Sequence, residues 1–573
     1  MLSDRIIPTP VAPSVATFTV LSAGNEVPRE FQVLSIVVNK AVNRIATATL
    51  ILRDGDPAAQ TFTASEEDYF VPGKELELKA GYQGTEDKIF SGVVVSHAIR
   101  VRDQRSVLEV VCKDPAFKMT LNPENRYFRD TTESDALEDI IRASGLTAEV
   151  EATTESKAEV IQYHCTNWDF VLTRADALGK ICITEGGTLS VKAPNLTQAS
   201  ALSLSYGGNL LSLDLQMDAR NQFKSINSKA WSMPNSELAE AEESTFTAPN
   251  AGNLTANDLA DAHGIDPLQQ QHGGNVSEAE LQDWSKARLQ KSRLARIRGR
   301  ARFQGIASLE VGQLVTLQGV GDRFNGQVFV SAIRHEINNG NWLTDAEFGL
   351  DDSWFTERFK VTQPRAAGII PPVSGLQIGI VTQIHDDPLG EHRVQIRLPL
   401  ISTEDDGTWA RVAVLDAGDT RGSFFRPEIG DEVVVGFLND DPRFPVITGM
   451  LNSSTRPAPL DATEDNHERG FVSRSGMKWL FNDEHNNILL ETPDGNLIDI
   501  SGENQSVTLG DQHGNKIVLD SNGITMESIK DIVLKAATNL EAEGMAVKID
   551  AQSTGEFAAS GTLTLKGGLV QIN

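Results

Sequence analysis

Cysteine and aromatic residues are scarce in this chain of 573 residues, and both shortages narrow its class. The three cysteines, Cys112, Cys165 and Cys182, are odd in number and lack the close spacing of a disulfide framework or a zinc knuckle. We expect free, buried thiols, since unpaired cysteine is among the most buried residue types. Aromatic residues make up only 6% of the chain, whereas glycine contributes 46 residues. This balance suits a β protein rich in turns.

Positive charge is also in short supply, because 51 Lys and Arg residues face 79 Asp and Glu residues and the net charge is -28. Phosphate binding needs a basic surface, so the composition argues against a nucleic-acid partner. No run approaches the roughly 18 apolar residues of a membrane span. Residues 1–20 contain three prolines and no apolar core of a secretory signal. We therefore expect synthesis in the cytoplasm without a signal peptide.

Enzyme signatures are missing as well. The chain has no G-x-S-x-G elbow, Walker loop, H-E-x-x-H helix or EF-hand loop. His335-Glu336 lacks the second histidine of a zinc protease. The carboxylate pairs Asp386-Asp387 and Asp405-Asp406 lie in turns, where solvated surface is a better interpretation than glycosidase catalysis. The sequence predicts no catalytic residue, no cofactor and no metal site.

What the chain does contain is a short β unit repeated over its last hundred or so residues. Apolar residues two positions apart recur there at intervals of mostly 7 to 10 residues, with turn signals at Gly495, Gly514 and Gly523. Period-two alternation over such short runs indicates strands with one buried face. The side chains expected in the core are Ile498, Ile500, Val507, Leu509, Ile517, Leu519, Ile524, Ile532, Leu534, Val547, Ile549, Leu563 and Leu565.

Two or three buried side chains per strand cannot form a core alone, so the strip needs partners to cover its apolar face. An intertwined trimer of identical strips would do this. A single-chain solenoid is the alternative, but its repeat is usually longer and more uniform. The short, irregular units favour the trimer.

Strand signals also dominate upstream of the strip. Alternating runs in residues 15–120 predict a β-barrel or sandwich, and strands return at 184–231 and 302–350. Helices are expected after Thr132, from Asn167 and from Ser277, each at a capping residue. Residues 233–276 are polar and predict an exposed insertion or loop. Five strand-like segments in 376–451 fit a small OB-type barrel.

The segment from Lys286 to Arg302 carries eight basic residues and no acidic one. We expect an interdomain or intersubunit surface that faces the protein's own carboxylates. A nucleic-acid patch and a solvated helix face are the alternatives, and the acidic chain disfavours the first.

Three stretches resemble the VgrG-type spike of contractile injection systems, a family that corresponds to a fusion of phage tail hub and spike proteins. Residues 162–171 are similar to the family's Q-Y-x-E-S-x-x-x-F segment, with Cys165 where glutamate is usual. Residues 408–412 are similar to a strand of the family's barrel. Residues 427–437 and 441–449 resemble its P-x-x-G-x-E-V-V-V-x-F…D-P-x-x-P-x-x-x-G pattern. The likeness covers nearly the whole chain.

The resemblance implies a homotrimer that is mainly β with a few short helices. Tail-hub-like β-barrel domains with helical insertions would occupy residues 1–370 and an OB-fold collar 371–459. An intertwined triple-stranded β-helix would occupy 460–573. The implied partners are an inner tube protein, baseplate components, a PAAR-like tip protein and, transiently, the target membrane. The tip protein would bind Leu569, Val570, Gln571, Ile572 and Asn573.

The implied function is structural: a central spike that caps the inner tube and pierces the target envelope as part of an assembled particle. Only about ten residues separate the barrel from the strip, and no effector domain follows, so an extracellular injection system or tailocin is favoured over a type VI spike. Such a particle could be released outside the cell. A cell-wall-hydrolysing tail enzyme and a trimeric carbohydrate-binding tail fibre are the alternatives.

Overall fold

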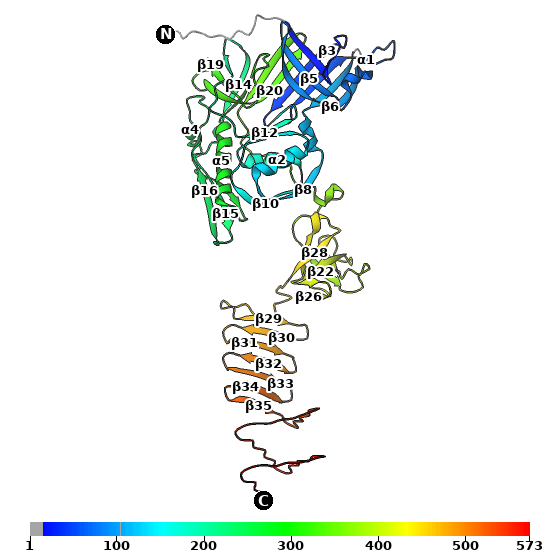
Figure 1. The fold of residues 1–573 in the computed structure, drawn as a ribbon, viewed down its shortest axis with the longest axis vertical. Coiled ribbons are helices and arrows are strands. Elements are labelled where there is room, and N and C mark those ends of the chain that lie inside the picture. Colours follow the sequence, from blue (N-terminus) through cyan, green and yellow to red (C-terminus); the bar gives the residue numbers. More distant parts are fainter. Residues whose placement is uncertain (1–14, 103–104, 573) are drawn as a thin grey trace. The chain divides into compact units, whose positions relative to one another are not determined.

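The chain folds as a mainly β protein with a few short helices, the fold class that the sequence predicts. The computed structural model describes residues 15–102 and 105–572. The chain divides into two compact units, one ending at Ala367 and the other beginning at Gly368. Figure 1 shows the elements of each unit. The separate boundary expected between barrel and strip, at residues 459 and 460, stays a prediction. No helix within the described ranges is long and apolar enough to cross a membrane.

A 13-stranded sheet is the framework of the first unit. Alternation places Ala48, Leu50 and Leu52 of one strand in the core. Segments that are far apart in the sequence pair within this sheet: Ile36 lies opposite Ile337 in neighbouring strands. The strands are β1 (Ala16–Ser22), β2 (Asn25–Glu26), β3 (Val33–Ala41), β4 (Thr47–Arg53), β5 (Glu75–Tyr82), β6 (Thr85–Arg102), β7 (Arg105–Lys113), β13 (Leu202–Ser205), β14 (Leu210–Met217), β18 (Ile297–Gln304), β19 (Leu314–Gln318), β20 (Gly326–Asn338) and β21 (Asn341–Phe348).

A smaller layer of two helices and two small sheets has its own core in the first unit. Helix α2 (Glu133–Ala143) begins after Thr132, whose Oγ1 accepts a hydrogen bond from the Asp135 amide, as the sequence predicts. Helix α3 (Asn167–Ala177) is capped by Thr166, one residue before the predicted cap. The Asn167 side chain instead accepts a hydrogen bond from Gln162. The strands of this layer are β8 (Pro123–Thr132), β9 (Thr147–Val150), β10 (Ser156–Thr166), β11 (Ile181–Glu185) and β12 (Thr188–Lys192).

Residues 233–276 were predicted to be an exposed insertion or loop, and the loop alternative is wrong for part of this insertion. It contributes β16 (Glu237–Glu243), α4 (Ala256–Ala260) and β17 (Leu268–His272). β16 and β17 flank β15 (Ile226–Ser232) in a three-stranded sheet. Helix α5 (Glu278–Leu294) packs against this sheet, and Figure 1 labels it beside β15 and β16. The apolar residues of β16 are mostly alanines, so its alternation was hard to recognise in the sequence.

The basic run of α5 and β18 does face the protein's own carboxylates, but within one unit. Lys291 pairs with Asp176, and Arg302 donates to both carboxylate oxygens of Asp345 at 2.8 Å. Arg296 serves differently, because its guanidinium nitrogens donate to the backbone oxygens of Leu254 at 2.6 Å and Ala251 at 2.8 Å. The run therefore holds the insertion and the neighbouring elements to α5 and β18. The interdomain or intersubunit surface expected from the sequence is not what these contacts form.

The second unit begins with a closed five-stranded barrel, as the sequence predicts for an OB-type fold. Its strands are β22 (Gln377–Gln383), β23 (Val394–Arg397), β24 (Thr408–Val412), β27 (Glu432–Phe437) and β28 (Pro445–Leu451). Val381, Ile396, Val433, Val435 and Ile447 are among the residues that fill its core. The small hairpin of β25 (Ala417–Gly418) and β26 (Arg421–Gly422) projects from the loop between β24 and β27.

The strip forms a seven-stranded antiparallel sheet in which each strand pairs with its neighbours in sequence. Its strands are β29 (Glu468–Val472), β30 (Lys478–Asn482), β31 (Asn487–Glu491), β32 (Leu497–Ser501), β33 (Ser506–Gly510), β34 (Lys516–Asp520) and β35 (Gly523–Glu527). The backbone ladders of β29–β35 thus lie within one chain, which differs from the interchain ladders that an intertwined strip implies. The described residues after Glu527 contain no helix and no strand.

Candidate functional site

Apolar side chains form two continuous columns across one face of the strip. Residues directly opposite in the antiparallel ladder point to the same face, as do residues two apart in a strand. Ile498 pairs with Leu509 and Ile500 with Val507, so each column runs unbroken from strand to strand. The columns consist of Phe471, Trp479, Leu490, Ile498, Leu509, Ile517 and Met526, and of Phe481, Ile488, Ile500, Val507, Leu519 and Ile524. We call these thirteen side chains the apolar face of the strip.

Much of this face is open to solvent in the single chain. Ile500 keeps 44% of its surface exposed, Trp479 45% and Ile524 72%. Monomeric soluble proteins rarely expose contiguous apolar patches of more than a few hundred Å². Covering a large apolar side chain completely is worth about 1.5–3 kcal/mol, so each half-covered one could still contribute about 1 kcal/mol. The face is therefore a contiguous apolar surface that the described part of the chain does not cover by itself, and it is the candidate interaction surface.

The opposite face of the strip is mixed in character. Its middle positions include Asp499 and Thr508 as well as Leu489 and Val518. Ion pairs tie neighbouring strands at its margin, with 3.0 Å between Lys478 Nζ and Glu491 Oε2. A second pair of the same kind joins Lys516 and Glu527, also at 3.0 Å. The polar side chains make this the face suited to water.

Stacked turns along one edge hold successive strand pairs in register. Gly495 and Gly514 occupy equivalent places in two of these turns, with φ of 89° and 93°, a region that favours glycine. The Asn515 side chain donates to Asp511, and this contact holds the pKa of Asp511 below its usual range. The Asn496 side chain in turn accepts a hydrogen bond of 3.3 Å from the Gln512 amide of the next turn. The glycines Gly476, Gly495 and Gly514 recur every 19 residues. At the same spacing, the Asn496 side chain donates to Thr492 as the Asn515 side chain does to Asp511.

An aromatic series links the apolar face to the OB barrel. Phe471 stacks on Phe425 of the barrel's long loop, with 5.3 Å between ring centroids and 14° between planes. Trp479 and Phe481 continue the series, at 5.8 Å from Phe471 to Trp479 and 5.6 Å from Trp479 to Phe481. The sequence-based core missed these three strip residues, although Trp479 and Phe481 show the same two-residue spacing. The 19-residue repeat would have identified them, since it aligns Trp479 with Ile498 and Ile517.

The predicted core residues fall into two groups. Ile498, Ile500, Val507, Leu509, Ile517, Leu519 and Ile524 all lie on the apolar face. Ile532, Leu534, Val547, Ile549, Leu563 and Leu565 lie beyond the last strand and are each more than half exposed. Membership of a trimer core stays a prediction for both groups.

The predicted tip residues lie at the end of the same strandless stretch. Leu569 is 85% exposed and Ile572 83%, while Val570 and Gln571 are also exposed. Asn573 lies outside the described residues. Binding of a tip protein by these residues stays a prediction.

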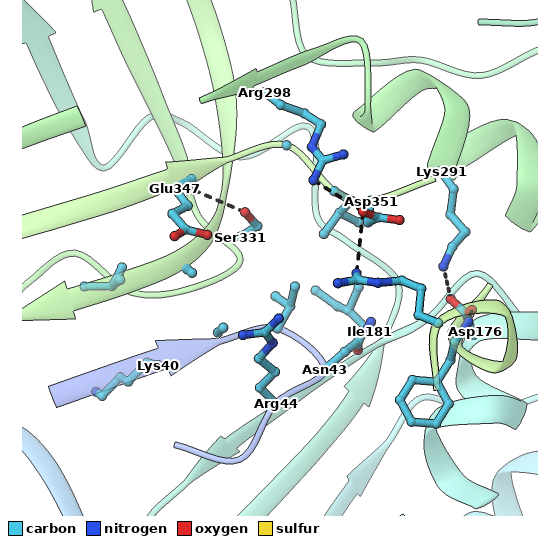
Figure 2. Close-up of a pocket in the computed structure, with 18 of the residues that line it drawn as sticks. Lys40, Asn43, Arg44, Asp176, Ile181, Lys291, Arg298, Ser331, Glu347 and Asp351 are labelled. Atoms are coloured by element: carbon cyan, nitrogen blue, oxygen red, sulfur yellow. Dashed lines mark hydrogen bonds and ion pairs between the residues drawn. The ribbon is translucent and has the colours of Figure 1, made fainter. Parts of the chain in front are cut away.

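The first unit contains a charged cavity of about 540 Å³, shown in Figure 2. Asp351 is the centre of one ion-pair group there, because its carboxylate lies 3.3 Å from Arg298 and 3.5 Å from Arg358. Lys291 and Asp176 form another pair on the neighbouring wall, as the dashed lines in Figure 2 mark. Arg44 extends its guanidinium into the space between these walls. The walls of the cavity thus carry two groups of ion pairs, centred on Asp351 and on Asp176.

A histidine and two cysteine thiols are buried in the first unit. His335 lies in the core and shares a 3.0 Å hydrogen bond with Thr344 Oγ1, and burial lowers its pKa to about 3. Burial raises the pKa of the Cys112 thiol to about 12 and also raises that of Cys182. Both thiols are buried, as the sequence predicts, whereas Cys165 is only partly so. No group of three or more potential metal-ligating side chains occurs in the part of the chain that the structure describes.

Two family models match parts of this chain. A family model described as "Alg8 N-terminal domain" matches residues 12–339, more than half of the chain. A second, described as "Type VI secretion system/phage-baseplate injector OB domain", matches residues 377–451, the segment that forms the closed barrel.

Curated relatives are spike proteins of type VI secretion systems. The spike protein VgrG1b of Pseudomonas aeruginosa is 24% identical over 385 residues, which are 62% of this chain and 50% of the relative. VgrG1a of the same organism is 22% identical over 434 residues, 70% of this chain and 66% of the relative. The chain thus spans about half to two thirds of the length of these relatives. It is VgrG-like, and its type VI relatives give no support to the extracellular or tailocin particle that the sequence favoured.

Among solved structures, the 43 kDa tail protein of prophage MuSo2 from Shewanella oneidensis is similar over 59% of this chain and 99% of its own. The sequence identity is 13% and the TM-score is 0.45.

Proposed function

Because the chain belongs to the Alg8 N-terminal domain family and also carries an injector OB domain, we propose that it is the central hub and spike of a contractile injection apparatus. The observation that carries this proposal is the apolar face of the strip, which follows the OB barrel and is left uncovered by its own chain. The role is structural: the first unit meets the inner tube and the baseplate, and the strip is the shaft.

The proposed assembly is a homotrimer. Three strips with their apolar faces turned inward would enclose a triangular core, and each strand would contribute up to two side chains to a layer. The ion pairs and polar side chains of the opposite face would then face water. Two strips packed face to face would also cover the apolar columns, so the resemblance to trimeric spikes is what favours three.

Residues 528–572 form no strand ladder within their own chain, so their backbone groups are available for pairing with other copies. Its apolar pairs keep the two-residue spacing of the strip, yet the single chain gives them no ladder. Strands cannot be stable without neighbours that satisfy their backbone groups. We infer that 528–572 takes its neighbours from the other two copies, which makes this stretch the intertwined part of the shaft.

The end of the shaft would carry the tip protein. Leu569, Val570 and Ile572 expose apolar side chains that a small PAAR-like cap would cover. Behind that cap, the trimer would concentrate the force of contraction on a small area of the target envelope. The particle that contains it is assembled from protein synthesised in the cytoplasm.

Mass measurement in solution tests the assembly directly. Light scattering on the purified chain should give three times the chain mass of 62.2 kDa at micromolar concentration. A monomer or a dimer would contradict the proposed spike, since neither can form a three-sided shaft.

A further inference from the structure

A cavity of about 580 Å³ lies along strand β17 in the first unit. All five residues of β17 line it, so the cavity follows the strand rather than touching one end. Trp284 and Arg288 of α5 form a second side, and the third is Trp354 with the start of α6 (Phe355–Arg358). Its volume is within the range of about 300–1,000 Å³ that is typical of ligand pockets.

β17 is an edge strand whose outer backbone groups are free. It pairs only with β15, in parallel, and the Leu268 amide donates to the Ser225 oxygen at 3.0 Å. The direction of backbone groups alternates along a strand, so those of Gln269 and Gln271 point away from β15. Within the described ranges, nothing in the chain hydrogen-bonds to these two amides and two carbonyls.

Three of the usual protections of an edge strand are also missing from β17. Edge strands normally carry charged residues, proline or a bulge that prevents pairing with another chain. The sequence of β17 is Leu-Gln-Gln-Gln-His, and its register with β15 is regular from Leu268 to His272. A free edge of this kind beside a cavity is suited to receiving another strand.

The walls of the cavity indicate the chemistry of the occupant. Arg288 lies 3.5 Å from Glu357, and Asp176 pairs with Lys291, so the charged side chains on the walls are already matched. The ring of Trp354 has Arg288 and Lys291 within 5.6 Å and 5.4 Å of its centroid. Trp284 contacts His272 edge-on, with 5.9 Å between ring centroids. Aromatic walls with balanced charge favour an uncharged segment with an apolar side chain.

We propose that this groove binds an extended, uncharged segment of a partner polypeptide, which adds to the sheet as a strand beside β17. Its backbone hydrogen-bonds to Gln269 and Gln271, and one apolar side chain packs against Trp284 and Trp354. Main-chain bonds supply affinity and the side-chain pocket supplies selectivity in this mode of recognition. The groove is lined only by residues of the first unit, so the strip contributes no residue to it.

A capped heptapeptide, acetyl-Ser-Thr-Val-Trp-Val-Thr-Ser-amide, is a suitable probe, titrated into the full-length chain by calorimetry. Two versions carry N-methyl groups on alternate residues, one set at the odd positions and one at the even. Only one set faces β17, so one version should lose at least tenfold in affinity while the other binds like the unmodified peptide. Equal affinities for both, or no binding of the unmodified peptide, would overturn the proposal.

Variants of the protein complement the modified peptides as a test of the same groove. Gln271→Pro removes an outward amide and leaves the bonds to β15 intact, so the affinity should fall at least tenfold; Gln271→Ala is the matched control and should bind normally. Trp354→Ala should also weaken binding. Circular dichroism checks that each variant is folded. A different outcome would be that Gln271→Pro lowers the assembled mass and that the wild-type chain does not bind the peptide. A second copy of the chain would then fill the groove, and the proposal of a separate partner would fail.

Discussion

Phe425 of the OB barrel's loop stacks almost flat on Phe471 of the first strand of the strip, with 5.3 Å between ring centroids and 14° between planes. Glu428, three residues after Phe425, pairs with Arg474 at 2.8 Å, three residues after Phe471. Barrel and strip are therefore joined by a ring stack and an ion pair as well as by the covalent linker.

Phe471→Ala should loosen that joint. An offset aromatic pair is worth about 0.5–1.5 kcal/mol beyond its buried area, and the substitution also removes the first member of one apolar column. We expect limited proteolysis to cleave residues 452–467 faster than in the wild-type chain. Phe444→Ala is the matched control, because Phe444 lies in the same barrel, is 53% exposed and should leave the rate unchanged. Equal cleavage of both variants would contradict the role of the stack.

Ile517→Asp should abolish the assembled shaft. In a trimer this substitution would place three carboxylates in one apolar layer, where each unpaired charge costs several kcal/mol. Light scattering should then report a monomer or loose oligomers. Thr525→Asp places the same group on the opposite face and should keep the assembled mass. An Ile517→Asp chain that stays trimeric would show that the apolar face points outward.

His335 should make the stability of the first unit depend on pH. Burial lowers its pKa from 6.5 to about 3, with a smaller contribution from Lys40, so the proton binds more readily to the unfolded chain. The stabilisation is complete above pH 6.5 and is lost as the pH falls towards 3, at up to about 1.4 kcal/mol per pH unit. Thermal unfolding between pH 7 and pH 4 measures it. His335→Gln should reduce the dependence of the unfolding free energy on pH. If that dependence is unchanged in the variant, groups other than His335 cause it.

Arg296→Met should destabilise the first unit by about 1–3 kcal/mol, because the partly buried carbonyls of Leu254 and Ala251 lose their charged donor. Denaturant unfolding measures the loss. Arg300→Met in the adjoining strand is the control, since Arg300 is 55% exposed and its carboxylate partner Asp214 is 3.7 Å away and mostly exposed. That variant should remain within about 1 kcal/mol of wild type. Equal losses would refute the specific role of Arg296.

Local patterns predicted most of the strands, the helix caps near Thr132 and Ser277, and the residues of one strip face. These signals depend on neighbours in sequence, as with Ile498 and Ile500, whose spacing alone places them on one side. The pairing of Ile36 with Ile337 depends on contacts between distant segments, which a single sequence does not reveal. β17 was missed for a similar reason, since its polar residues form a strand only because β15 offers a partner.

The aromatic start of the strip was missed although its spacing was visible. Trp479 and Phe481 follow the same alternation as later pairs and lie within the predicted strip, yet the predicted core began only further along the chain. The strandless stretch after Glu527 is the opposite case, because its apolar pairs predict strands that one chain does not form.

Gly476, Gly495 and Gly514 are spaced by 19 residues, so the length of the strip is set by its number of 19-residue repeats. Each repeat supplies two strands, and adjacent strands are about 4.8 Å apart, so one repeat adds about 9.5 Å. Whole repeats could be inserted or deleted without changing which side chains face inward, whereas a single inserted residue within a strand would turn the following ones outward. The length of the strip can therefore change between related sequences only in steps of one repeat, about 9.5 Å each.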